Sequence, residues 1–111
     1  MLACALTALV LSAASALTED QKIEKLIQTV GDMKDAVFIS NGTEHTPAQA
    51  AQHMRNKWER ARDQVKTAEE FIDKLASKSS TSGKPYLIRF KDGRELESGT
   101  FLREELKKLT S

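Results

Sequence analysis

Hydroxyl and cationic side chains gather in one short stretch of the chain, SKSSTSGKPY, which runs from Ser77 to Tyr86. It holds four serines, one threonine and two lysines, and backbone N–H groups near Gly83 are expected to be free. A loop of this kind is able to hold an anion or an extended polar polymer. The candidate binding surface therefore consists of His45, Ser79, Ser80, Ser82, Lys84 and Tyr86.

A structural role is the alternative for the same serine loop. Loop hydroxyls commonly hydrogen-bond nearby backbone groups, so they would satisfy the end of the preceding helix and tie the loop to a sheet. Loops often carry function, but most polar loops bind no ligand. Both interpretations stay open on the sequence.

The serine loop does not match the catalytic motifs that combine serine with lysine. Thr81 stands three residues before Lys84, so the SxxK pattern is absent there. A phosphate-binding loop needs an earlier glycine, and it needs serine or threonine where this chain has Pro85. Acidic pairs such as Glu69-Glu70 suit exposed helix faces, and nothing sets two of them across a cleft. No catalytic residue is predicted, and an enzyme is the less favoured class.

Candidate metal ligands are few. The single cysteine is Cys4, so the chain beyond it has no thiolate ligand and no disulfide. A zinc site needs three or four ligands on a compact scaffold. His45 and His53 lie eight residues apart on either side of a predicted helix start, and no HExxH motif is present. The sequence predicts neither a metal site nor a cofactor.

The first sixteen residues, MLACALTALVLSAASA, form an uncharged apolar run. The run ends in Ala14-Ser15-Ala16, the small-x-small pattern of a cleaved secretory signal, although it lacks the usual basic residues at its start. It is shorter than the roughly 20 residues of a membrane-spanning helix. We expect cleavage after Ala16, a periplasmic location, no membrane attachment afterwards, and one domain over residues 17–111.

Charge is nearly balanced, with 17 Lys and Arg against 16 Asp and Glu and a net charge of +1. Basic and acidic side chains alternate along the chain without long runs of one sign. Domains that bind nucleic acid usually show a clearly basic surface, and anionic lipid attracts a polybasic block. We therefore expect no nucleic-acid partner.

The elements that must position the candidate surface begin with a helix and a hairpin. A capping box of Thr18 and Gln21 starts a helix from Glu19 to about Val30. The β-branched and aromatic run over residues 36–40 predicts a strand. Asn41-Gly42 is a strong hairpin signal, and residues 43–45 would form the returning strand.

Two further helices are expected before the serine loop. Thr46-Pro47 supplies a capping hydroxyl and a proline at the first helical position. Thr67 and Glu70 form a second capping box, which favours a bend and a new helix. The buried stripe of the first of these helices is predicted at Ala51, Met54, Trp58, Ala61 and Val65. The buried face of the second is predicted at Phe71, Ile72, Leu75 and Ala76.

A second hairpin and a closing helix follow the serine loop. Residues 86–90 predict a strand, Asp92-Gly93 a turn, and residues 95–97 the returning strand. Ser98 is expected to cap a last helix whose Phe101, Leu102, Leu106 and Leu109 face inward. The predicted fold class is α+β, a small antiparallel sheet of two hairpins packed against about four helices.

Three ordered motifs resemble those of the YfeK-like family of small exported bacterial proteins of unknown function. They are FI-x-NG-x-x-HT from Phe38 to Thr46, KTAEEFI from Lys66 to Ile72, and ASKSS-x-SGKPY from Ala76 to Tyr86. The resemblance covers residues from about Ile23 to Leu106. It implies a Gram-negative periplasmic protein with a signal peptide, and it implies no catalytic or binding residue.

Three functional hypotheses follow. The leading one is a non-enzymatic periplasmic domain that binds a protein or a cell-envelope component. The second is a binder of small anions, or an enzyme acting on an envelope fragment, with His45 as base and the Ser77–Tyr86 loop as anion cradle; it needs these residues around one cavity. The third is an assembly role through the apolar stripe of the second helix. The sequence assigns neither the partner nor the oligomeric state.

Overall fold

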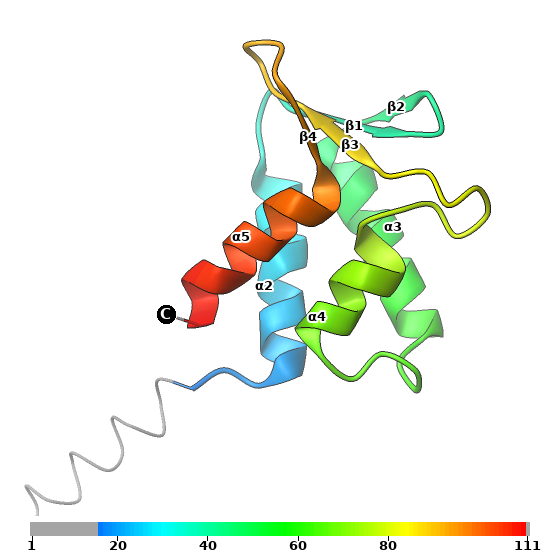
Figure 1. Ribbon diagram of the computed structural model, residues 1–111. Helices are drawn as coiled ribbons and strands as arrows, with labels where there is room; N and C mark the ends of the chain where they lie inside the picture. The colour runs from blue at the N-terminus through cyan, green and yellow to red at the C-terminus, as the bar shows by residue number, and fades with distance from the viewer. Residues whose placement is uncertain (1–15, 111) are drawn as a thin grey trace, which may run out of the picture.

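The computed structural model describes residues 16–110 (Figure 1). The predicted signal peptide lies outside this range, except for Ala16. Helices and strands follow one another as α2 (Glu19–Asp32), β1 (Val37–Ser40), β2 (Thr43–His45), α3 (Pro47–Arg60), α4 (Ala68–Phe71), the π-helical segment η1 (Ile72–Ala76), β3 (Leu87–Arg89), β4 (Glu95–Glu97) and α5 (Ser98–Thr110). None of the helices in the described range is long and apolar enough to span a bilayer.

The four strands form one antiparallel sheet in the order β2-β1-β3-β4. Both predicted hairpins are present, and the pairing of β1 with β3 joins them. In the β1–β2 turn, Asn41 and Gly42 have φ angles of 51° and 79°. Two successive positive φ angles are what a type I′ hairpin turn requires, and Asn-Gly is a sequence that favours this turn.

The helices cover one face of the sheet, which lies across their upper ends in Figure 1. Phe38 and Ile88 are opposite each other in the β1–β3 register, and both are buried on this face. Beneath them, α2 packs against α3 and the core continues through Trp58 and Phe71. The α+β fold class is thus confirmed, and Trp58 is the predicted core anchor, with 2% of its surface exposed.

Three threonines begin helices. Thr18, Thr46 and Thr67 each accept a hydrogen bond from the backbone N–H three residues later, and each is reciprocated by a Gln or Glu side chain. These capping boxes satisfy donors that a helix start otherwise leaves unpaired. The bend predicted before Thr67 is confirmed, because α3 ends at Arg60 and α4 begins at Ala68.

Two details of the predicted helices were wrong. Ala61 and Val65 were placed on the stripe of the second helix, but α3 ends at Arg60: Ala61 is its C-cap, and Val65 is buried from the connecting segment. Ser98 was expected to cap the last helix, but its buried hydroxyl has no hydrogen-bond partner in the described part of the chain. Its backbone N–H donates instead to the carbonyl of Tyr86 at 2.8 Å, which fixes the residue against the sheet.

A carboxylate of α2 also caps α4. Glu19 accepts a hydrogen bond from the backbone N–H of Ala68 at 2.8 Å, and its other oxygen accepts one from Lys22 at 2.8 Å. The bond from Lys22, followed by that from Ala68, lowers the pKa of Glu19 below its usual value. Glu19 therefore stabilises the fold in its charged form.

We expect Glu19→Gln to destabilise the domain near neutral pH, because it removes the charge from both contacts. The expected loss is only about 1 kcal/mol, since water screens contacts of a half-exposed carboxylate. A carboxyl whose folded pKa is lowered contributes stability above its unfolded pKa, and that contribution is lost as pH falls through the folded value. Urea unfolding should therefore show a larger difference at pH 7 than at pH 3. Glu69→Gln is the control, since Glu69 is also in a first helical turn but makes no bond to another helix among the described residues; an equal loss there would contradict the cross-helix cap.

Candidate functional site

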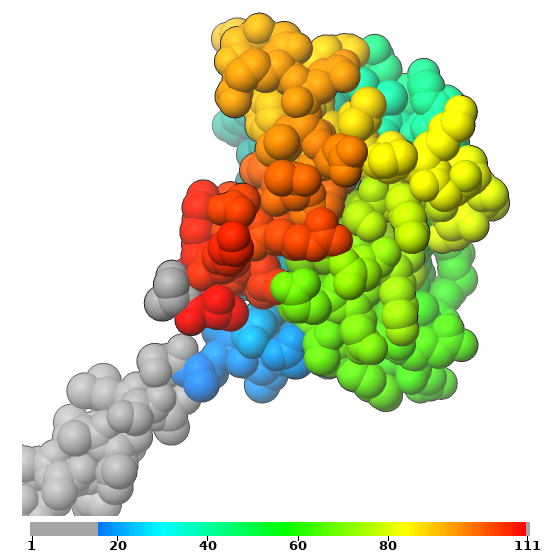
Figure 2. Space-filling model, viewed as in Figure 1, coloured from blue at the N-terminus to red at the C-terminus, as the bar shows by residue number. Residues whose placement is uncertain are grey.

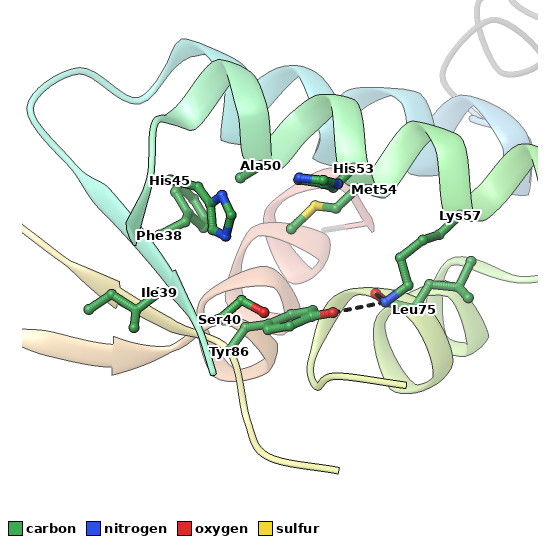
Figure 3. Close-up of a pocket in the computed structure, with 10 residues that line it drawn as sticks. All are labelled: Phe38, Ile39, Ser40, His45, Ala50, His53, Met54, Lys57, Leu75 and Tyr86. Carbon is green, nitrogen blue, oxygen red and sulfur yellow. Dashed lines mark hydrogen bonds between the residues drawn. The ribbon is translucent and has the colours of Figure 1, made fainter. Parts of the chain in front are cut away.

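A cavity of about 260 Å³ opens between α3 and the β1–β2 hairpin (Figure 3). One wall is the face of α3 that is turned toward the hairpin, and the opposite wall is the hairpin itself. Leu75 and Tyr86 close one end. Ligand pockets usually measure about 300–1,000 Å³, so this one suits a compact ligand. Its lining consists of Phe38, Ile39, Ser40, His45, Ala50, His53, Met54, Lys57, Leu75 and Tyr86.

Simple periodicities bring these residues together. Ala50, His53, Met54 and Lys57 are spaced by three, one and three residues, so α3 presents them on a single face. His45 pairs with Phe38 in the β1–β2 register, and paired residues lie on the same face of a sheet. The cavity is thus where one helical face meets the helix-side face of the hairpin.

Lys57 is the best-connected polar group of the cavity. Its Nζ donates to the carbonyl of Leu75 at 2.8 Å and to the hydroxyl of Tyr86 at 3.0 Å, and it lies 5.1 Å from the centre of the Tyr86 ring. The Leu75 carbonyl belongs to the last turn of η1, where carbonyls have no partner within the helix. Lys57 therefore links α3, the end of η1 and the entry to β3.

The side chains of His45 and His53 are in contact where they line the cavity. Their ring centres are 5.4 Å apart and the rings are inclined by 77°, an edge-to-face contact. Within residues 16–110, no three His, Cys, Asp or Glu side chains come together in a way that would hold a metal. Nor does the described part of the chain show a hydrogen bond from Ser40 to either imidazole, as an activated nucleophile would need. The arrangement is one that can bind a ligand.

The serine loop is hydrogen-bonded internally and to the β1–β2 turn. Ser79 is 5% exposed, and its hydroxyl accepts hydrogen bonds from the backbone N–H groups of Thr81 and Ser82 and from the side-chain amide of Asn41 at 3.2–3.3 Å. Ser82 in turn donates to the Asn41 carbonyl oxygen at 2.6 Å. We call Ser79, Ser82 and Asn41 the loop latch. Figure 2 shows the loop lying beside the first hairpin.

The residues of the candidate binding surface therefore do not come together at one place. His45 and Tyr86 line the cavity, while Ser79 and Ser82 belong to the loop latch. Lys84 lines a different hollow, beside Gly42 and Pro85, and Ser80 is exposed. The cavity that contains His45 has no residue of Ser77–Pro85 in its lining.

Sequence reasoning missed the central residue of the cavity, Lys57. The signal that would have found it is the second face of α3, on which a small residue, a histidine, a methionine and a lysine recur at helical spacing. The predicted apolar stripe overlaps this face at Met54. Met54 and Trp58 are buried in the core, and Ala51 and Ala61 are partly buried against it. The stripe therefore contributes to the core of the domain.

Comparison with known proteins finds a relative of unknown function. An uncharacterized protein YfeK from Salmonella typhimurium is 41% identical over 68 residues, which are 61% of this chain and 57% of that protein. The aligned part thus spans little more than half of the relative's length. No solved structure matches the chain. Residues 17–110 match the "Family of unknown function (DUF5329)", and the chain belongs to this family.

Proposed function

We propose that this chain is an exported, non-enzymatic binding domain of the bacterial cell envelope, and that its ligand enters the cavity between α3 and the first hairpin. Export is supported by the apolar N-terminal run that ends in Ala14-Ser15-Ala16. The observation that carries the binding role is the cavity itself, which combines an apolar body with a few converging polar groups.

The contacts within the serine loop favour the cavity over the loop as the binding site. The Ser79 hydroxyl already has three donors around it, and the Ser79 and Gly83 N–H groups bond to carbonyls of the loop itself at 2.9 Å. An anion cradle needs free donors that point to one place. Lys57 and Tyr86 meet that requirement better, because both line the cavity.

A fragment screen followed by amide NMR tests this proposal. In a chemically diverse library, we expect binders whose perturbed amides cluster on residues 38–45 and 50–57. Ala50→Leu adds three carbons to the cavity wall and should weaken these binders at least tenfold. Ala50 is 7% exposed, so circular dichroism must show that the variant is folded.

The matched control is the double variant Ser80→Ala plus Lys84→Ala, which leaves the cavity lining unchanged and should bind like the wild type. Perturbations confined to residues 78–84, and abolished by the double variant, would move the site to the serine loop. A screen without any binder would contradict a small-ligand role for the domain.

A further inference from the structure

Two hydrogen-bond donors meet at one end of the cavity without acceptors. The Lys57 ammonium has three N–H donors, and two are used, on the Leu75 carbonyl and the Tyr86 oxygen. The Tyr86 oxygen accepts from Lys57, so its own O–H is left to donate elsewhere. Among the described residues, neither the third Lys57 N–H nor the Tyr86 O–H has an acceptor.

These donors are 3.0 Å apart, between Nζ of Lys57 and the Tyr86 oxygen (Figure 3). One anionic oxygen can accept from both, and such charge-assisted bonds are stronger than neutral ones. The position is also held firmly. The Tyr86 N–H donates to the Ser77 carbonyl at 3.0 Å and its carbonyl accepts from the Ser98 N–H at 2.8 Å.

The charge of the lining agrees with an anionic ligand. Lys57 is the one Lys, Arg, Asp or Glu side chain among the ten residues that line the cavity. Glu44, next to His45, pairs with Ile39 rather than Phe38 and so points to the other face of the sheet. There it binds Arg89 at 2.7 Å, a contact that raises the pKa of Arg89. No carboxylate of the described chain therefore neutralises Lys57 inside the cavity.

The rest of the cavity fits a ligand with a small apolar group. Phe38, Ala50, Met54 and Leu75 supply apolar surface beyond the two donors. The cavity volume of about 260 Å³ lies at the small end of the range for ligand pockets. We therefore expect the group that enters it to be a branched or aromatic group of about one side chain's size.

We propose that the cavity recognises a compact carboxylate: an anionic head bound by Lys57 and Tyr86, and one aromatic or branched apolar group between α3 and β1. This rests on the proposed function, of which it specifies the ligand class. Two sources share this chemistry, a free small acid and the C-terminal residue of a peptide.

Isothermal titration with two probe pairs tests the ligand class. Phenylacetate is compared with neutral phenylacetamide, and the tripeptide Gly-Gly-Phe with its C-terminal amide. We expect each acid that binds to do so at least tenfold more tightly than its amide. Binding by phenylacetate alone would identify a free acid, and binding by the tripeptide alone would identify a chain end.

Variants link the preference to the two donors. Lys57→Met keeps most of the side-chain stem. It should lower the affinity for the acid at least tenfold and leave the affinity for the amide unchanged. Tyr86→Phe keeps the ring and should lower the affinity for the acid several-fold. Lys84→Met, a lysine outside the cavity, should have no effect. Amide NMR spectra establish that each variant is folded.

The outcomes separate this inference from the proposed function. If acids and amides bind equally, or if Lys57→Met leaves the acid affinity unchanged, the carboxylate inference is overturned and the cavity remains a binding site. If no probe binds while the fragment screen yields cavity binders, the ligand class is wrong. If neither experiment yields a cavity binder, both proposals fail.

Discussion

Trp58→Ala is expected to lower the free energy of unfolding by about 3–5 kcal/mol, the usual cost of removing a large aromatic side chain from a core. Trp58 is 2% exposed and its ring meets that of Phe71 edge-on, with centres 6.4 Å apart. The guanidinium carbon of Arg62 also lies 4.1 Å from the centre of the Trp58 ring. Since small domains are stable by about 5–15 kcal/mol in total, the loss should be evident as a large shift of the urea midpoint.

Trp58→Phe separates the packing of this residue from its polar atom. The Trp58 Nε1 is buried and has no acceptor among the described residues, and a buried unsatisfied donor costs about 1–3 kcal/mol. Phenylalanine removes this donor but also some volume, so we expect a net loss of no more than about 1–2 kcal/mol. Leu96→Ala, at a 38% exposed position, should change stability by about 0.5 kcal/mol or less. A loss below about 1 kcal/mol for Trp58→Ala would contradict its place at the centre of the core.

Local signals were sufficient for most of the fold. Capping boxes marked the helix starts, and Asn41-Gly42 and Asp92-Gly93 marked the hairpin turns. Such signals act within a few residues, so they can be read from the chain directly. The pairing of β1 with β3 and the burial of Ser98 depend on residues distant in sequence, and no local pattern indicates them.

The candidate site was predicted less well for the same reason. His45 and Tyr86 were identified, but Lys57 becomes important only because η1 ends beside it and offers the Leu75 carbonyl. Conversely, Ser79 resembles a free loop hydroxyl in the sequence, and its burial depends on Asn41, 38 residues earlier. The chemistry of a polar side chain is set by partners that the sequence around it does not show.

The loop latch holds a segment of the chain that leads into the cavity wall. The latch fixes the segment between η1 and β3 to the β1–β2 turn, and Tyr86 stands at the end of that segment. Ser40 in the cavity lining directly precedes Asn41 of the latch. We therefore expect Ser79 and Ser82 of the motif ASKSS-x-SGKPY to act on the cavity by positioning this segment.

Ser79→Ala is expected to destabilise the domain by about 1–3 kcal/mol, because it leaves the Asn41 amide and two backbone N–H groups without their acceptor. Ser80→Ala is the matched control one residue away; Ser80 is exposed, so its loss should stay within about 0.5 kcal/mol. Urea unfolding followed by circular dichroism measures both.

A double-mutant cycle with Asn41→Gly assigns the loss to the latch. Asn41 has a φ of 51°, a conformation that glycine adopts freely, so this change removes the side-chain bonds without straining the turn. If Ser79 and Asn41 act as one unit, their losses should fall short of additivity by about 0.5 kcal/mol or more. Additive losses would contradict the latch. A Ser79→Ala variant as stable as the wild type but unable to bind cavity fragments would mean that the Ser79 hydroxyl acts on the ligand, not on the fold.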